Sequence, residues 1–251
     1  MKKVNLMDYL DEVTAFSLEH EEPAWMTELR TTALKNADES ELPHIDRVKF
    51  HRWPLLNVHM ESYVPSEGNV ASFDQMKDNP LIVQQGSFHA FEQLPASLAE
   101  QGVIFTDIFT ALQEHPELVK EYYMTKAVLP EEDKLTAAHA AFMNSGVFLY
   151  VPKNVVIEEP IESLFIQDSD SNQPFFKHVL IVADNHSEFS YLERFQSTGH
   201  HAEKASGNIV VEVIAKDGAK VKYSAVDQLG QTVTTYMNRR GYIMRDASVD
   251  W

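Results

Sequence analysis

The sequence has no cysteine and comparatively few basic residues. Without a thiol these residues can form no disulfide, no thiolate metal site and no cysteine nucleophile. The 21 lysines and arginines are outnumbered by 38 aspartates and glutamates, which gives a formal net charge of −17. Because phosphates and anionic lipid surfaces are bound by clustered basic side chains, this balance argues against duplex nucleic acid or a membrane surface as a partner.

Long apolar runs are missing too. No stretch approaches the roughly 20 residues that a membrane helix needs, and the first ten residues lack the apolar core of a signal peptide. A cytoplasmic location is therefore the simplest prediction. The 251 residues are 44% hydrophobic and 24% charged, which is typical of a globular chain with one large domain or two small ones.

The first 145 residues have mainly the patterns of helices. Apolar residues recur at three- and four-residue steps between Leu6 and Phe16, and Pro23 has the backbone angle that suits the first turn of a second helix. Residues 44–90 are irregular apart from a short strand at 81–83. Further helices are predicted at 105–112, 116–123 and 135–142. We predict a mostly helical N-terminal domain over residues 1–145.

From Gly146 onward the pattern changes to short runs of strand-forming residues. Turns that contain Pro, Gly or Asp separate the runs, and residues 220–225 alternate strictly between apolar and polar positions. The predicted strands are 147–151, 164–166, 179–182, 189–195, 209–214, 221–226, 233–237 and 242–244. Residues 146–251 therefore form the second predicted domain.

A weak repeat runs through these strands. Each unit has an apolar strand, a corner with Asp184, Asp217 or Asp246, a small residue and another strand. An interval of about thirty residues is typical of stacked coils, as in a β-helix, and a β-sandwich is the alternative. Because the sequence stops inside the predicted strand at 249–251, we expect an incomplete β-helix, whose last edge continues in a longer chain or is covered by another one.

Common catalytic and nucleotide-binding motifs are absent from the sequence. The P-loop, the G-x-G-x-x-G fingerprint, the G-x-S-x-G elbow and the H-E-x-x-H zinc motif are all missing. Residues 168–172 resemble the start of a calcium loop, but Gln173 and Val179 stand where that loop needs glycine and glutamate. A polar turn is the favoured interpretation of this segment.

None of the eleven histidines has a spacing that identifies a metal site. His178 and His186 flank an apolar strand and could meet at one end of a sheet, although a structural or exposed role is favoured for both. The other histidines considered lie in predicted loops: His44, His51, His59, His200 and His201. No metal-binding residue is predicted.

Paired charges also have a structural interpretation. Glu158 and Glu159 could perform acid–base chemistry, but their position before a proline is more typical of a solvated turn. Arg239 and Arg240 could clamp an acidic partner, but the charged outer face of a strand is the favoured interpretation. The tryptophans predicted to anchor core packing are Trp25 and Trp53.

One segment resembles a known family. Residues 134–152 read KLTAAHAAFMNSGVFLYVP, followed by Glu159-Pro160-Ile161, and are similar to the entry of the β-helix in the SufB/SufD family of the SUF iron–sulfur cluster assembly machinery. Weaker similarities to this family, and in the N-terminal half to its SufD branch, lie at 22–25, 30–34, 42–43, 50–55, 241–242 and 246–251.

The resemblance implies an α+β chain with an N-terminal helical domain followed by a right-handed parallel β-helix. It also implies a non-catalytic scaffold subunit that pairs with a SufB-like chain and a SufC-like ATPase. An iron–sulfur cluster would then be present only transiently, at the level of the full complex. No catalytic, cofactor-binding or metal-binding residue of the family is transferred to a position here, because the family's later coils and C-terminal helical segment lie beyond residue 251.

Two other functions remain as alternatives. The first is a β-helix enzyme that acts on acidic polysaccharide, and the net charge of −17 argues against such a substrate. The second is a structural β-solenoid module that self-associates through an exposed β edge.

Overall fold

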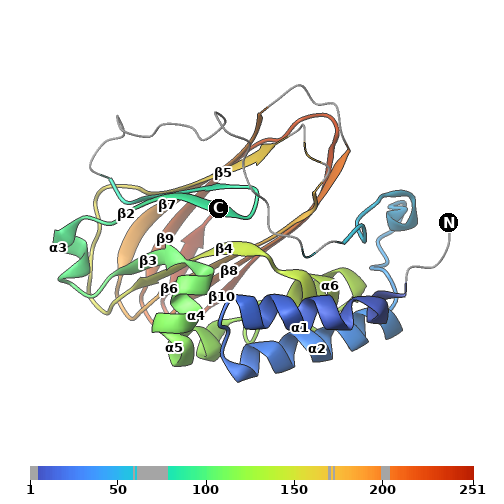
Figure 1. Ribbon diagram of the computed structural model, residues 1–251. Helices are drawn as coiled ribbons and strands as arrows, with labels where there is room; N and C mark the ends of the chain where they lie inside the picture. Colours follow the sequence, from blue (N-terminus) through green and yellow to red (C-terminus); the bar gives the residue numbers. More distant parts are fainter. Residues whose placement is uncertain (1–4, 59, 61–78, 169–170, 172, 199–203) are drawn as a thin grey trace.

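A computed structural model describes residues 5–58, 60, 79–168, 171, 173–198 and 204–251. A layer of helices lies against one of two β-sheets that face each other (Figure 1). The helices are α1 (Leu10–Glu19), α2 (Ala24–Glu39), α3 (Ala96–Ala99), α4 (Ile108–Glu114), α5 (Pro116–Tyr122) and α6 (Lys134–Phe142). The strands are β1 (Leu81–Gln85), β2 (Phe88–Gln93), β3 (Ile104–Asp107), β4 (Ser145–Val151), β5 (Ile161–Asp168), β6 (Phe175–Ala183), β7 (Glu188–Thr198), β8 (Ala205–Ala215), β9 (Lys220–Gln228), β10 (Val233–Ile243) and β11 (Ser248–Asp250).

Pro23 opens a helix as predicted, and Asp133 caps another. Pro23 is the N-cap of α2, and the Asp133 carboxylate accepts hydrogen bonds from the first amides of α6. The prediction of one helix over 105–112 is wrong in its first half. Residues 104–107 form β3, which pairs antiparallel with β4, and the Asp107 carboxylate caps α4 by accepting from the Phe109 amide.

The strands form a β-helix. Successive strands from β4 to β11 alternate between two sheets, with orders β11-β9-β7-β5-β1-β2 and β10-β8-β6-β4-β3. Neighbouring strands are parallel except β1–β2 and β3–β4. The predicted β-helix is therefore confirmed, and the β-sandwich is wrong, because its neighbouring strands would run antiparallel. Strands β1 and β3, from the N-terminal half, extend the two sheets, and the domain division at residue 145 stays a prediction.

The corners of the coils explain the weak repeat in the sequence. One residue in each corner has a left-handed backbone: Asn154, His186, Gly218 and Asp246, with φ of 63°, 58°, 71° and 58°. Gly, Asn and Asp adopt this conformation at the lowest cost. The corners stack, since the His186 amide donates to the Asp217 carbonyl of the next coil at 3.0 Å. A side chain on Gly218 would collide with the His186 ring, so this corner needs glycine. The small residues that follow the corners in the repeat are buried at Ser187 and Ala219.

Side-chain alternation divides the apolar residues into two cores. Val179 and Ile181 of β6 point into the β-helix, whereas Phe176 and Leu180 pack in the cluster that also contains the buried residues of α1, α2 and α6. Strand β6 is buried along its whole length, which accounts for its continuous apolar sequence.

A buried ion pair joins two helices of the helical layer. The Arg30 guanidinium donates to the Glu22 carboxylate at 2.6 and 2.8 Å and to the Ala141 carbonyl at 3.1 Å, which ties α2 to α6.

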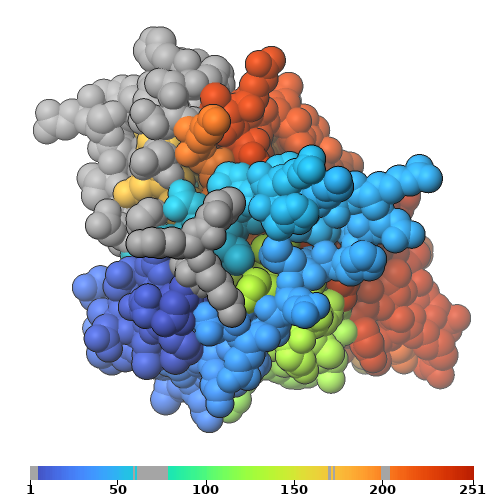
Figure 2. Space-filling view, turned by 90° about the vertical axis from the view of Figure 1, so that its right-hand side faces the viewer, coloured from blue at the N-terminus to red at the C-terminus, as the bar shows by residue number. Residues whose placement is uncertain are grey.

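The segment 41–58 covers the N-terminal end of α6. Figure 2 shows it, in cyan, between the helices in blue and green and the last strands in red. Phe50 and Leu55 pack with Leu135, and the Phe50 ring lies edge-on to Tyr236 of β10 at 6.3 Å. The predicted core role of Trp53 is wrong, because its neighbour Phe50 occupies the buried position and Trp53 stays 46% exposed. Among the described helices, none is long and apolar enough to cross a membrane.

Candidate functional site

A chain of buried polar groups crosses the interface between the helical layer and the β-helix. His139 lies on α6, and His178 and Glu212 point outward from β6 and β8 toward the helices; all three have no exposed surface. The His139 Nε2 and His178 Nδ1 atoms are 3.0 Å apart, and the His178 Nε2 atom is 3.2 Å from the Glu212 carboxyl. At the other end, His139 Nδ1 lies 3.2 Å from the Asn208 side-chain oxygen. We call these four residues the interface polar chain.

The outer hydrogen bonds fix the direction of the proton donors in this chain. The Asn208 amide donates to the Leu135 carbonyl at 2.8 Å, so its oxygen faces His139 and must accept a proton from it. His139 then accepts from His178, which leaves Nε2 of a neutral His178 unprotonated and 3.2 Å from the Glu212 carboxyl, without a hydrogen bond of its own. An ionised Glu212 would face this lone pair with a negative charge, so the order favours a neutral carboxylic acid at Glu212.

Burial shifts the pKa values in the direction that this arrangement requires. Burial raises the pKa of Glu212 to about 8, although hydrogen bonds from the backbone amides of Met124 and Val128 act in the opposite direction. Burial lowers the pKa of His178 to about 3, and burial together with the His178 ring lowers the pKa of His139 well below its ordinary value. At neutral pH the interface polar chain is therefore uncharged, and it stabilises the contact between the helical layer and the β-helix.

A second polar group lies inside the β-helix. The Lys177 ammonium donates to the Gln84 side-chain oxygen at 2.8 Å and to the Gly86 carbonyl at 3.1 Å, and burial lowers the pKa of Lys177 to about 7.

The two neighbouring arginines of β10 point to opposite faces. Arg239 forms ion pairs with Glu193 at 2.7 Å and Asp227 at 2.8 Å. The prediction that both arginines lie on an outer face is therefore wrong for Arg239. Adjacent strand residues point to opposite faces, and only Arg240 points outward, where it pairs with Glu132 at 2.7 Å.

Other residues considered from the sequence are not brought together. His178 contacts His139 and Glu212, while His186 lies at a corner over Gly218, so the two do not converge. Glu158 and Glu159 are exposed in the connection that precedes β5, and His44 and His51 are also exposed. Outside the described residues lie His59, His200, His201 and most of the calcium-loop-like segment. Within the described ranges, no group of three His, Cys, Asp or Glu residues could hold a metal ion.

Sequence reasoning missed His139 and Glu212. Both stand alone in apolar runs, AAHAA and VVEVI, at positions that face the other layer. A single polar residue in a run that is buried on both sides needs a partner, because an unpaired buried polar group is costly. That signal could have identified both residues, but it could not have paired them.

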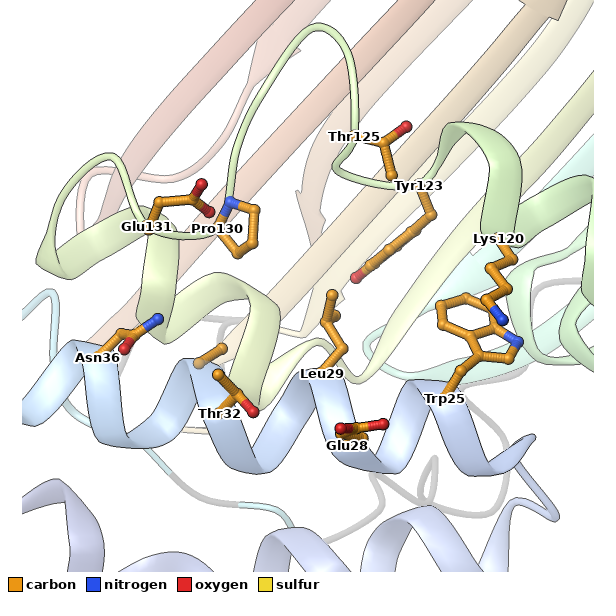
Figure 3. A pocket seen from close by; sticks show the side chains of 11 residues that line it. Trp25, Glu28, Leu29, Thr32, Asn36, Lys120, Tyr123, Thr125, Pro130 and Glu131 are labelled. Atoms are coloured by element: carbon orange, nitrogen blue, oxygen red, sulfur yellow. The ribbon is translucent and has the colours of Figure 1, made fainter.

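The surface carries a groove of about 430 Å³ between α2 and the segment 120–131 (Figure 3). Its floor is apolar, with Leu29, Ala33 and Tyr123, and the Tyr123 ring lies 4.3 Å from the His178 ring of the interface polar chain. Polar side chains stand along its rims.

Two family models together match almost the whole chain. The model described as SufBD protein N-terminal region matches residues 3–162, and the one described as SUF system FeS cluster assembly, SufBD core domain, matches residues 165–251. The boundary between the two matches lies in β5.

Relatives match over nearly the same range. The iron–sulfur cluster assembly protein SufD of Bacillus subtilis is 42% identical over 248 residues, which cover 94% of this chain and 56% of the relative. A SufBD family protein of Staphylococcus epidermidis is 28% identical, over 95% of this chain and 54% of the relative. The chain thus spans about half the length of the curated relatives it matches. It belongs to the SufB/SufD family of the SUF system of iron–sulfur cluster assembly.

Proposed function

We propose that this chain is part of a non-catalytic scaffold subunit for iron–sulfur cluster assembly in the cytoplasm. In this proposal it pairs with a SufB-like protein and works with a SufC-like ATPase. The observation that carries the proposal is the match of both SufBD family models, one after the other, along one chain. The 42% identity to a SufD protein favours the SufD-like member of the pair.

The fold suits a framework. Its coils are joined by continuous parallel ladders, and the neutral interface polar chain ties the helical layer to them without a charge that would need solvent. Iron–sulfur clusters are held chiefly by cysteine thiolates, and these 251 residues contain none. Thiolate ligands for a cluster would therefore lie outside these residues, in the rest of a longer protein or in a partner, with the cluster present only transiently in the complex.

Co-purification tests this proposal. The full-length protein that contains these residues is expressed with a tagged SufB-like chain and a SufC-like ATPase from the same source, and the complex is isolated by affinity and size-exclusion chromatography. We expect all three chains to elute together. Elution of the full-length protein away from both partners would contradict the proposed function.

Light scattering on the same fractions distinguishes the self-association alternative. A scaffold subunit gives one mass for the mixed complex at every concentration. A mass that grows with concentration for the isolated protein, without binding of either partner, would favour a self-associating module instead.

A further inference from the structure

The groove between α2 and the segment 120–131 contains two buried donors that lack an acceptor. The Tyr123 hydroxyl and the Trp25 indole N–H have no hydrogen-bond partner, and Tyr123 is only 1% exposed. In Figure 3 the Tyr123 hydroxyl points toward Leu29 on the groove floor. Buried donors are nearly always paired, because an unpaired one forfeits its hydrogen bond to water. A ligand with acceptor atoms would satisfy both.

Charge is distributed unevenly along the groove. Lys120 lies at the same end as the Trp25 indole nitrogen in Figure 3, whereas Glu131 lies at the opposite end and Glu28 stands on the rim between them. A carboxylate would be attracted to the Lys120 end, where an ammonium and an indole N–H are both available as donors. The two glutamates would repel negative charge elsewhere. The ligand therefore carries its acidic group at one end only.

The shape of the groove favours an extended peptide. One rim is formed by Glu28, Thr32 and Asn36 of α2, which span about 12 Å at 1.5 Å per residue. That length corresponds to between three and four residues of extended chain at about 3.3 Å each. A peptide also supplies backbone carbonyls for the Tyr123 hydroxyl and an apolar side chain for the floor.

We propose that this groove binds an extended peptide segment of a partner protein, with a carboxylate between Lys120 and Trp25 and an apolar side chain over Leu29. The site lies on the helical layer and does not depend on the proposed scaffold function. A carboxylate is also found on small metabolites, so the test must separate a peptide from a free carboxylate.

Binding can be followed through the three tryptophan indole resonances in an NMR titration of the chain, with the Trp25 resonance assigned by its loss in Trp25→Phe. The probes are acetylated, C-terminally amidated tripeptides, Leu-Leu-Asp and its reverse Asp-Leu-Leu, with matched peptides that contain Asn in place of Asp. We expect one Asp peptide to shift the Trp25 resonance saturably, and its Asn counterpart to bind at least about tenfold more weakly.

Three variants show whether the groove donors cause this binding. Lys120→Gln should weaken binding of the Asp peptide at least about tenfold, whereas Lys126→Gln, an exposed lysine of the same segment that does not line the groove, should leave it unchanged. Tyr123→Phe should weaken binding without lowering the melting temperature, because the hydroxyl has no partner within the chain. A hydroxyl with a purely structural role would lower the melting temperature and leave binding intact.

Each other outcome overturns the proposal. A Trp25 resonance that does not shift saturably up to about 10 mM of either Asp peptide would exclude the site. Equal binding by wild type and Lys120→Gln would exclude carboxylate recognition there. Sodium butyrate that binds as tightly as the better peptide would show a small carboxylate as the ligand and not a peptide.

Discussion

Gly146→Ala is expected to destabilise the chain by about 3 kcal/mol or more. Gly146 lies in β4 opposite His178 of β6, and an added Cβ would collide with the His178 carbonyl oxygen and lie 3.0 Å from its carbonyl carbon. Neither backbone can retreat easily. The Gly146 carbonyl accepts from the Gln84 side chain at 2.7 Å, and His178 belongs to the interface polar chain. Urea unfolding of wild type and variant measures the loss.

Gly241→Ala is the matched control, since it makes the same substitution in a parallel strand. There the nearest atom to an added Cβ is a side-chain carbon of Ile243 at 3.5 Å, an ordinary contact. We expect a change within about 0.5 kcal/mol, or a small gain from the lower entropy of the unfolded chain. Similar losses for the two variants would show that close approach of β4 and β6 does not set the requirement for glycine.

Glu212→Gln is expected to gain stability relative to wild type as the pH rises from 5 to 8. In wild type the folded pKa of Glu212 is about 8 and the ordinary value is 4.5. Between these values the folded chain keeps a proton that the unfolded chain has lost. The stabilisation is therefore complete below the ordinary value and is lost as the pH rises toward the folded value, at up to about 1.4 kcal/mol per pH unit. Glutamine has no such proton to lose.

The variant also has a constant cost. With the amide nitrogen in the position of Oε2, which lies 3.2 Å from His178 Nε2, the Met124 amide that donates to this oxygen at 2.8 Å loses its acceptor. We expect a loss of about 1–3 kcal/mol near pH 5 that shrinks or reverses by pH 8. Unfolding free energies at several pH values measure both effects.

Glu188→Gln is the control for this pH dependence. Glu188 pairs with Lys220 at the surface at 3.2 Å, where an ion pair contributes at most about 1 kcal/mol, and its removal should give a difference that is nearly constant over the same range. If Glu212→Gln tracked wild type in the same flat way, Glu212 would be ionised in the folded chain and the assigned donor order would be wrong.

The local sequence pattern predicted the β-helix well, because a few neighbouring residues determine each of its strands and corners. Each Asp-containing corner places one residue in the left-handed conformation, and glycine at position 218 leaves room for the stacked His186. Such requirements are visible within a few residues. The same holds for Pro23 at the start of α2.

Contacts between distant residues could not be predicted in this way. Residues 104–107 pair with β4 some forty positions later in the sequence, and this pairing overrides their helical spacing. His139 and Glu212 meet His178 only because α6 packs on the outer face of β6 and β8. Alternation along a strand allows only one of Arg239 and Arg240 on the outer face, and the register of β10, which the sequence alone did not fix, decides which one.

The groove was missed for a similar reason. Trp25 and Tyr123 lie nearly one hundred residues apart, and each fits an ordinary apolar position in its own helical segment. Only the packed structure shows that both polar atoms lack an acceptor.

The stacking of coils can be tested most directly by cross-linking, since a chain without cysteine gives a clean background. Ser190 of β7 is in register with Lys222 of β9, and neighbouring strands lie about 4.8 Å apart. In the double variant Ser190→Cys, Lys222→Cys, we expect rapid reaction with dibromobimane, which becomes fluorescent when it joins two thiols. The pair Ser190→Cys, Val226→Cys is displaced by four residues, roughly 13 Å, and should react only singly. Equal cross-linking of the two pairs, or failure of the first, would contradict a β-helix with this register.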